Sequence, residues 1–322
     1  MTRVVVVAFP NGMASSLAIT LDVLDTANHM SRQSGRHPPF QVHRVPVGRA
    51  ASVTFGRGDV LIVPGLGGTS EAEVIARLAT APVRRAVRLA GQAREAGASI
   101  AASCAGTFVL AEAGLLSQRR ATTTWWLAAL FRRRYPDVIL EPDAIVVADW
   151  PLATAGAAMA QMDLMLSIIA RFASPGLSAA CARYLLLDRR RSQAPYMALA
   201  FLAGQDERIA RADAWVRKNI RKDFSMEAVA DAAGLSPRTF ARRLALVCGL
   251  SPIRFVQRIR IEAAELLLET TRLSVDEVAR RVGYAEPSTL RRLIRRESRR
   301  SPAELRRSEP LSDAPRPRGA TA

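Results

Sequence analysis

A cysteine lies where an apolar stretch of this sequence gives way to a helical one. Residues 99–103 are typical of a buried strand, and the residues after Gly106 have helical spacing. Cys104, placed between them, has the setting of a nucleophile elbow, a tight turn that exposes a side chain at the carboxyl edge of a sheet. The N-terminus of the following helix would lower the pKa of the thiol. Considered alone, Cys104 is a candidate nucleophile.

A different chemistry is indicated near the C-terminus, where residues 226–240 correspond to residues 275–289. In each copy an alanine, Ala230 or Ala279, precedes a glycine by four residues. The small alanine lets two helices approach closely, and the glycine adopts the backbone conformation of a tight turn between them. The repeat therefore predicts two helix-turn-helix units.

The second helix of each predicted unit is rich in arginine. A single arginine on a helix is equally well explained by a solvated surface, but the duplication favours contact with double-stranded DNA. We expect phosphate contacts to dominate the affinity and a few side chains to read bases. The candidate DNA-binding residues are Arg238, Thr239, Arg242 and Arg243 in the first unit, and Ser288, Arg291, Arg292, Arg295 and Arg296 in the second.

The two units are separated by residues 251–270, which predict one helix of about 20 residues and roughly 30 Å. A rigid spacer of that length sets two recognition helices near one turn of DNA, roughly 34 Å, apart. One chain would then enter two successive major grooves.

Length and charge agree with this interpretation. A chain of 322 residues favours two domains, and its net charge of +17 indicates a polyanionic partner such as nucleic acid. Residues 206–307 carry 23 Arg and Lys against 14 Asp and Glu, whereas residues 1–205 carry 21 against 13 over twice the length. The preference for arginine over lysine is also expected of a GC-rich genome.

The cysteines and the apolar segments predict a cytoplasmic protein. Three widely separated cysteines without CxxC spacing favour neither a disulfide framework nor a zinc site, and we expect no metal and no cofactor. No signal-peptide pattern follows Met1. The most apolar stretch, 152–172, contains Gln161 and Asp163, which argue against a membrane span and a membrane partner.

The order of the predicted elements divides the chain. Alternation of strands and helices predicts an α/β fold with a doubly wound parallel sheet, followed by an all-α part. Strands are expected at 3–9, 40–47, 59–63, 99–103 and 138–147, and helices at 16–30, 71–95 and 157–191. We expect an N-terminal domain at 1–192, a linker at 193–205, a DNA-binding domain at 206–307 and a disordered tail at 308–322.

At the repeat, the sequence resembles the AraC family of transcriptional regulators. The resemblance covers about 100 residues and rests on residues 234–244, 249–252, 260–267 and 301–306. Leu290 departs from a position where that family often has an aromatic residue. The resemblance implies sequence-specific binding of promoter DNA.

The N-terminal part resembles the class I glutamine amidotransferase-like fold, specifically the PfpI-type domains of GlxA-type regulators. Residues 63–67, 103–106, 113–116, 121–125 and 154–157 carry the resemblance. It implies a flavodoxin-like sheet, a homodimer, and frequent activation of genes of nitrogen or amino-acid metabolism. A small-molecule effector, an amino acid or another nitrogenous metabolite, is the expected partner.

Enzymes on this fold pair the cysteine with a histidine and often a carboxylate. Here Thr124 stands where the motif Thr-Thr-His-Trp has its histidine, and Ser16 stands where the first helix has its acidic residue. All three histidines precede residue 45. We therefore expect a pseudo-nucleophile and no enzyme activity. The alternatives are a Cys104-dependent amidase or hydrolase of the PfpI type, and a regulator whose Cys104 senses oxidants.

A ligand pocket is expected where the strands end at their carboxyl edge. Four segments should converge there: 10–16, 64–69, 104–105 and 122–125. The glycines would let backbone amides approach an anionic group, although they equally suit a simple strand-to-helix turn. Trp125 and Trp126 would form an aromatic wall or pack in the core. The candidate ligand-binding residues are Ser16, Gly65, Gly67, Gly68, Cys104, Thr124 and Trp125.

Overall fold

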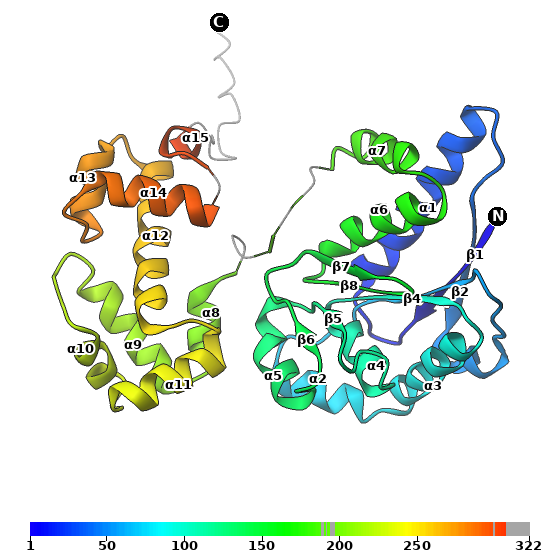
Figure 1. Cartoon of the computed structure of the whole chain (residues 1–322), viewed down its shortest axis with the longest axis horizontal. Helices are drawn as coiled ribbons and strands as arrows, with labels where there is room; N and C mark the ends of the chain where they lie inside the picture. Colours follow the sequence, from blue (N-terminus) through cyan, green and yellow to red (C-terminus); the bar gives the residue numbers. More distant parts are fainter. Residues whose placement is uncertain (188–189, 191, 194–196, 299, 307–322) are drawn as a thin grey trace, which may run out of the picture. The chain divides into compact units, whose positions relative to one another are not determined.

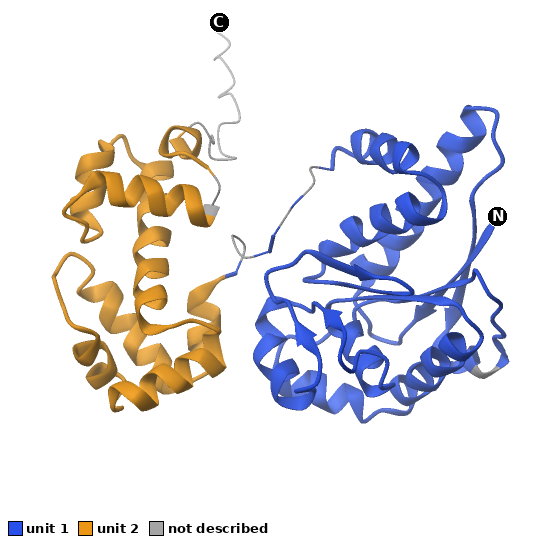
Figure 2. Ribbon diagram, in the orientation of Figure 1, with its two compact units in different colours: residues 1–197 blue, residues 198–322 orange. Residues whose placement is uncertain are grey.

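The computed structural model describes residues 1–187, 190, 192–193, 197–298 and 300–306. The chain divides into two compact units, residues 1–197 and residues 198–322 (Figure 2). The boundary falls inside the segment 193–205 that we predicted to be a linker. Helix α8 (Leu199–Gly204) belongs to the second unit, because it buries Leu199 and Leu202 there. The predicted tail, 308–322, lies outside the described residues.

Six strands of the described first unit form one sheet, in the order β2-β1-β3-β4-β8-β7. The first five pair in parallel, and β7 joins the edge antiparallel to β8. The doubly wound sheet predicted from the sequence is therefore present, with one antiparallel edge. The strands are β1 (Thr2–Ala8), β2 (Phe40–Pro46), β3 (Val60–Val63), β4 (Ser99–Ser103), β7 (Val146–Asp149) and β8 (Leu152–Ala155).

Alternate residues of the strands face two different helical layers. In β1, Val4 and Val6 pack in one core and Val5 and Val7 in the other, as the twofold periodicity of a strand requires. One layer consists of α1 (Ala14–Gln33), α6 (Ala160–Phe172) and α7 (Pro175–Tyr184) (Figure 1). The other consists of α2 (Glu71–Leu78), α3 (Ala81–Glu95), α4 (Thr107–Glu112) and α5 (Ala128–Arg134).

Three sequence expectations about these elements were wrong in detail. The single helix expected at 71–95 is broken into α2 and α3, and Pro82 lies in the first turn of α3. The region 157–191 is broken into α6 and α7, because Ser174 caps α7 and Pro175 begins it. The strand expected at 138–147 is two strands, β6 (Ile139–Leu140) and β7, and β6 pairs with β5 (Arg120–Ala121) in a small second sheet.

The described residues of the second unit form helices and no strand. Apolar faces of these helices make its core, with Phe240, Phe255, Leu290 and Ile294 almost fully buried. Among the described residues no helix is long and apolar enough to cross a membrane. The helices after α8 are α9 (Glu207–Lys218), α10 (Met226–Ala232), α11 (Pro237–Cys248), α12 (Pro252–Thr270), α13 (Val275–Arg281), α14 (Pro287–Ser298) and α15 (Pro302–Arg306).

Candidate DNA-binding surface and cysteine elbow

The first helix-turn-helix unit consists of α10 and α11. Ala230 is fully buried between the helices, and Gly234 has a φ of +65° in the turn that joins them. The Ser236 hydroxyl accepts a hydrogen bond from the backbone N–H of Thr239, and Pro237 occupies the first turn. These contacts begin α11 where the sequence predicted.

The second unit repeats this arrangement in α13 and α14. Ala279 is fully buried, and Gly283 has a φ of +81°. A Cβ atom on Gly283 would lie 2.3 Å from the carbonyl oxygen of Ile220, so the turn has no room for a side chain. The glycine is therefore required here both by its backbone conformation and by a close backbone contact.

Helix α12 runs between the two helix-turn-helix units of the second half of the chain (Figure 1). It has 19 residues, which gives a length of about 29 Å. The Arg260 guanidinium on this helix lies 5.2 Å from the ring centroid of Phe224 and 5.5 Å from that of Tyr284. Phe224 precedes α10, and Tyr284 lies in the turn before α14. Each helix-turn-helix unit is thus connected to α12 by one aromatic ring that stacks on the Arg260 side chain.

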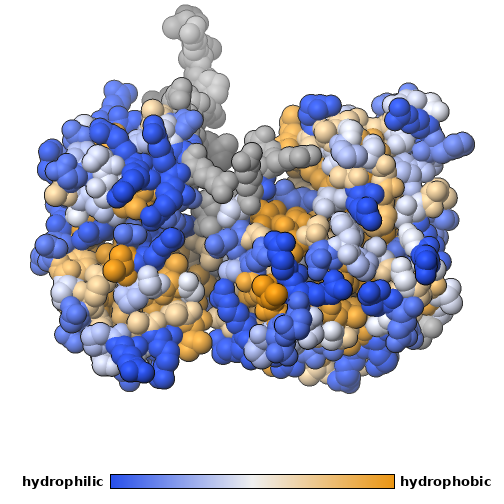
Figure 3. Space-filling view, viewed as in Figure 1, coloured by the Kyte–Doolittle hydropathy of each residue, from blue (hydrophilic) through white to orange (hydrophobic). Residues whose placement is uncertain are grey.

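All seven predicted arginines of α11 and α14 are exposed, as is Ser288, whereas Thr239 is half-buried. Three of the seven are engaged: Arg243 pairs with Asp206, Arg291 pairs with Asp276, and Arg296 pairs with Glu297. The other four make no hydrogen bond or ion pair with any described residue, and they are Arg238, Arg242, Arg292 and Arg295. Figure 3 shows hydrophilic side chains gathered over α14. Both second helices therefore present unpaired guanidinium groups to solvent.

Cys104 occupies the elbow that the sequence predicted. Its φ is +52°, in the left-handed region, and the turn Cys104–Gly106 connects β4 to α4. The Cys104 backbone N–H donates to the carbonyl of Gly156 at 2.9 Å. A Cβ atom on Gly106 would lie 2.5 Å from the carbonyl oxygen of Pro64, so this glycine lets the turn pack directly on the chain that follows β3.

The structure brings Ser16, Gly65, Cys104 and Thr124 together. A Cβ atom on Gly65 would lie 3.3 Å from the Cys104 Cβ and 3.4 Å from the Ser16 hydroxyl oxygen. The Thr124 side chain adjoins the thiol. Ser16, Cys104 and Thr124 are all buried, and the hydroxyl oxygens of Ser16 and Thr124 make no hydrogen bond of ordinary geometry with a described residue.

Burial raises the pKa of the Cys104 thiol to about 11. The backbone of Ala105 and the side chain of Thr124 offset this rise in part, and no charged side chain of the described residues contributes. The backbone at the start of the helix lowers this pKa, as expected, but removal of the thiol from water is the larger effect, so the pKa is raised overall.

The other predicted ligand residues lie in the loop after β3 and at the start of a short 3-10 turn. Gly67 and Gly68 have φ values of +79° and +101°, and a Cβ atom on Gly67 would lie 2.8 Å from the carbonyl oxygen of Asn11. The Arg77 guanidinium donates to the same carbonyl at 3.0 Å and so fixes this loop. Trp125 is half-buried at the start of a short 3-10 turn.

One buried polar residue beside the elbow had no signal in the sequence. Gln193, which we assigned to the linker, is only 2% exposed. Its side chain donates to the carbonyls of Thr123 and Pro142 at 3.0 and 2.6 Å and accepts from the backbone N–H of Ala157 at 3.1 Å. A lone glutamine in a polar stretch shows no periodicity, so only the fold reveals these contacts.

Comparison with known proteins gives a match for each unit. Residues 19–171 match the DJ-1/PfpI family, and residues 229–308 match a helix-turn-helix domain. The chain therefore joins a domain of the DJ-1/PfpI type to a helix-turn-helix domain of the kind found in AraC-family regulators. In the described part of the chain, no group of three or more His, Cys, Asp or Glu residues is placed to hold a metal ion.

Relatives of this chain include the HTH-type transcriptional regulator CdhR of Pseudomonas aeruginosa, 28% identical over 67% of this chain and 66% of CdhR. The HTH-type transcriptional activator RhaS of an Enterobacter species is 36% identical over 34% of this chain and 40% of RhaS. Both matches span less than two thirds of the relative's length. Among solved structures, an AraC family transcriptional regulator from Pseudomonas putida is 21% identical and covers 57% of this chain and 100% of its own, with a TM-score of 0.45.

Proposed function

We propose that this regulator binds promoter DNA through α11 and α14 and thereby controls transcription. The observation that carries the proposal is the pair of helix-turn-helix units on one helix, each with exposed arginines that have no partner among the described residues. Unpaired guanidinium groups on a second helix suit contacts with both guanine edges and phosphates.

The candidate residues divide by their present contacts. Arg238, Arg242, Arg292 and Arg295 need give up no protein contact to reach DNA. Arg243 is held by Asp206, which also caps α9, and Arg291 and Arg296 are also paired with carboxylates. We assign these three, together with Thr239 and Ser288, to backbone contacts that position the helices.

The proposal extends to the N-terminal domain, which we regard as a non-catalytic sensor. A cysteine nucleophile acts as the thiolate, and a thiol with a pKa of about 11 is protonated at neutral pH. Thr124 also supplies no base where a histidine would stand. We propose that this domain forms a homodimer and responds to a small effector, an amino acid or another nitrogenous metabolite, and that the protein activates transcription, as the name of RhaS states for that relative.

Two substitutions test the DNA-binding surface. Arg242→Ala and Arg292→Ala should each weaken binding to a DNA fragment that the unaltered protein has selected from a random pool. The loss should be about 1–3 kcal/mol if each arginine makes a good base contact. Arg211→Ala provides a matched control, since Arg211 is exposed on α9, outside both second helices. Fluorescence anisotropy at fixed ionic strength measures the dissociation constants.

The same titration separates the alternatives. If both variants lose affinity for the selected fragment and Arg211→Ala does not, the assignment of α11 and α14 as the recognition helices is supported. If neither variant changes the affinity, the recognition helices are wrongly assigned. If the unaltered chain selects no sequence from the random pool, the proposal as a whole is wrong.

A further inference from the structure

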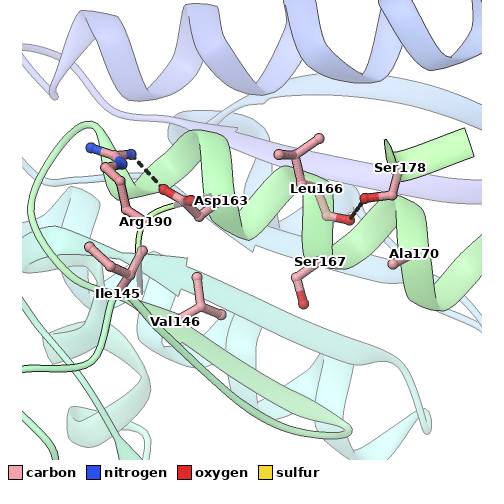
Figure 4. Close-up of a pocket in the computed structure, with 8 residues that line it drawn as sticks. All are labelled: Ile145, Val146, Asp163, Leu166, Ser167, Ala170, Ser178 and Arg190. Carbon is pink, nitrogen blue, oxygen red and sulfur yellow. Dashed lines mark hydrogen bonds and ion pairs between the residues drawn. The ribbon is translucent and has the colours of Figure 1, made fainter. Parts of the chain in front are cut away.

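A pocket opens on the first unit beside α6, at the antiparallel edge of the sheet (Figure 4). Its volume is about 560 Å³, within the range of small-molecule sites. The residues that line it do not include Ser16, Cys104 or Thr124. They are Ile145, Val146, Asp163, Leu166, Ser167, Ala170, Ser178 and Arg190.

One end of the pocket carries two opposite charges. The Arg190 guanidinium pairs with the Asp163 carboxylate at 2.5 Å, and the same Nη2 atom donates to the carbonyl of Met159. The Nε and Nη1 groups of Arg190 have no hydrogen-bond partner among the described residues. Burial raises the pKa of Asp163 in spite of the arginine, so water screens this pair only weakly.

The rest of the pocket lining is mostly aliphatic. Leu166 and Ala170 of α6 supply apolar surface at the end away from the ion pair, and Ile145 and Val146, at the start of β7, supply it beside the ion pair (Figure 4). The Ser178 hydroxyl is already satisfied, since it donates to the carbonyl of Leu166 at 2.8 Å. A bound molecule therefore meets charge at one end of the pocket and mostly hydrocarbon along the rest of it.

We propose that this pocket binds a small zwitterion with a short aliphatic body, and that it is the effector site of the sensor domain. The proposal rests on the regulatory function proposed above. The ligand carboxylate accepts from the unpaired N–H groups of Arg190, and its cationic group lies toward Asp163. A simple anion would be repelled by Asp163 and a simple cation by Arg190, whereas a zwitterion satisfies both.

The position of Arg190 connects this pocket to the chain that leads into the second unit. Two residues further on, the Ser192 hydroxyl donates to the carbonyl of Asp143, and the Gln193 backbone N–H donates to the same carbonyl. A ligand that holds Arg190 therefore strengthens the attachment of this segment to the sensor domain. An effector beside this segment needs no route through the closed cysteine elbow.

Three probes with the same hydrocarbon body test the charge requirement. Thermal unfolding of the full chain is followed with leucine, which is zwitterionic, with 4-methylpentanoate and with 3-methylbutylamine. Leucine at roughly one hundred times its dissociation constant should raise the unfolding temperature by about 2 °C or more. Equal shifts with leucine and 4-methylpentanoate would overturn the zwitterion requirement, and no shift with any probe at about 10 mM, a ceiling that detects even millimolar affinity, would overturn the site.

Three variants locate the binding. Arg190→Gln removes the charge, and Ala170→Leu narrows the aliphatic end without touching the ion pair. Arg171→Gln is the matched control, because Arg171 is exposed on α6 and does not line the pocket. The leucine shift should disappear in the first two variants and persist in the third; its persistence in Ala170→Leu and Arg190→Gln would place binding elsewhere.

DNA binding by the unaltered chain, measured in parallel, separates this inference from the proposed function. A chain that binds its selected DNA but none of the probes overturns the pocket assignment alone. A chain that binds leucine but no DNA supports the pocket and contradicts its role in a regulator.

Discussion

Cys104 combines a backbone conformation typical of an elbow nucleophile with surroundings that do not suit one. Its φ is +52°, yet its side chain is 4% exposed and adjoins hydroxyl and backbone groups. An elbow that serves catalysis needs a base or a cation to favour the thiolate. Here burial favours the neutral thiol, so the strained turn persists without the chemistry for which such turns are known.

The raised pKa of Cys104 predicts a specific dependence of stability on pH. The folded state keeps the thiol protonated up to about pH 11, whereas the unfolded chain releases this proton near pH 9. The stability that the buried neutral thiol of Cys104 contributes is therefore fully present below pH 9 and is lost as the pH rises toward 11. Between pH 8 and pH 10 the unaltered protein should lose about 1 kcal/mol that Cys104→Ala does not lose.

Urea unfolding of both proteins at the two pH values measures this difference. Other groups titrate in the same range, but they do so equally in both proteins. An equal loss of unfolding free energy in Cys104→Ala would contradict the argument that burial raises the pKa of Cys104. Cys104 would then again be a candidate nucleophile.

At this scale the sequence predicted the elbow and the missing histidine but not the closure of the site. The order of a strand, Cys104 and a helix is local, and Thr124 is recognisable from its motif. Burial, in contrast, comes from distant segments: the Thr123 hydroxyl donates to the Cys104 carbonyl, and the Gly156 carbonyl accepts from its N–H. No pattern within one segment carries that information.

At the scale of elements, the two helix-turn-helix units use one motif under different constraints. A Cβ atom on Gly234 would have no neighbour nearer than 3.6 Å, whereas a Cβ atom on Gly283 would strike the carbonyl of Ile220. Both glycines have positive φ, so each resists substitution for its backbone conformation. Only the second is also fixed by packing against the chain between α9 and α10.

The pair predicts unequal costs for the same substitution. Gly234→Ala should reduce the unfolding free energy by about 1–2 kcal/mol, the cost of left-handed backbone for alanine. Gly283→Ala should cost about 3 kcal/mol or more, because overpacking is added to it. Urea unfolding of the full chain measures both; equal costs would show that the turn at Gly283 relaxes without penalty.

Element types were predicted well where periodicity was long, and poorly where elements were short. The helices α1 and α12 have helical periodicity, and strand β1 is a clear run of β-branched residues. Strand β8 is a run of four buried residues, Leu152–Ala155, that periodicity cannot distinguish from the helix after it. The breaks at Thr80 and Ser174 were missed because a proline in the first turn begins a new helix inside an otherwise continuous apolar pattern.

At the scale of the whole molecule, the two units are joined by a segment that is anchored to the first. The Gln193 side chain reaches into the first unit, and a Cβ atom on Gly156 would lie 2.4 Å from its amide oxygen. Glycine at 156 is therefore what admits this glutamine. The anchor lies beside Thr123, which in turn binds the elbow carbonyl.

Removal of the anchor should destabilise the first unit. Gln193→Ala leaves the buried carbonyl of Thr123 and the half-buried backbone groups of Pro142 and Ala157 without their partner, at a cost of about 1–3 kcal/mol. Hydrogen exchange of the Ala157 amide should also become faster, since that N–H loses its acceptor. Gln33→Ala, at the exposed end of α1, is the control. An unchanged exchange rate at Ala157 in Gln193→Ala would show that the Gln193 side chain does not stabilise this part of the first unit.

Helix α12 has a consequence for the genome as well as for the protein. The two DNA-facing helices that it separates, α11 and α14, differ in sequence and belong to one chain. The DNA-binding part of a single chain therefore has no internal twofold axis. Under the proposed DNA binding, each chain should recognise two different short words about one helical turn apart. A single chain therefore needs no palindrome, and in the proposed homodimer only the pair of words as a whole would be repeated, because operator symmetry mirrors the symmetry of the protein that reads it.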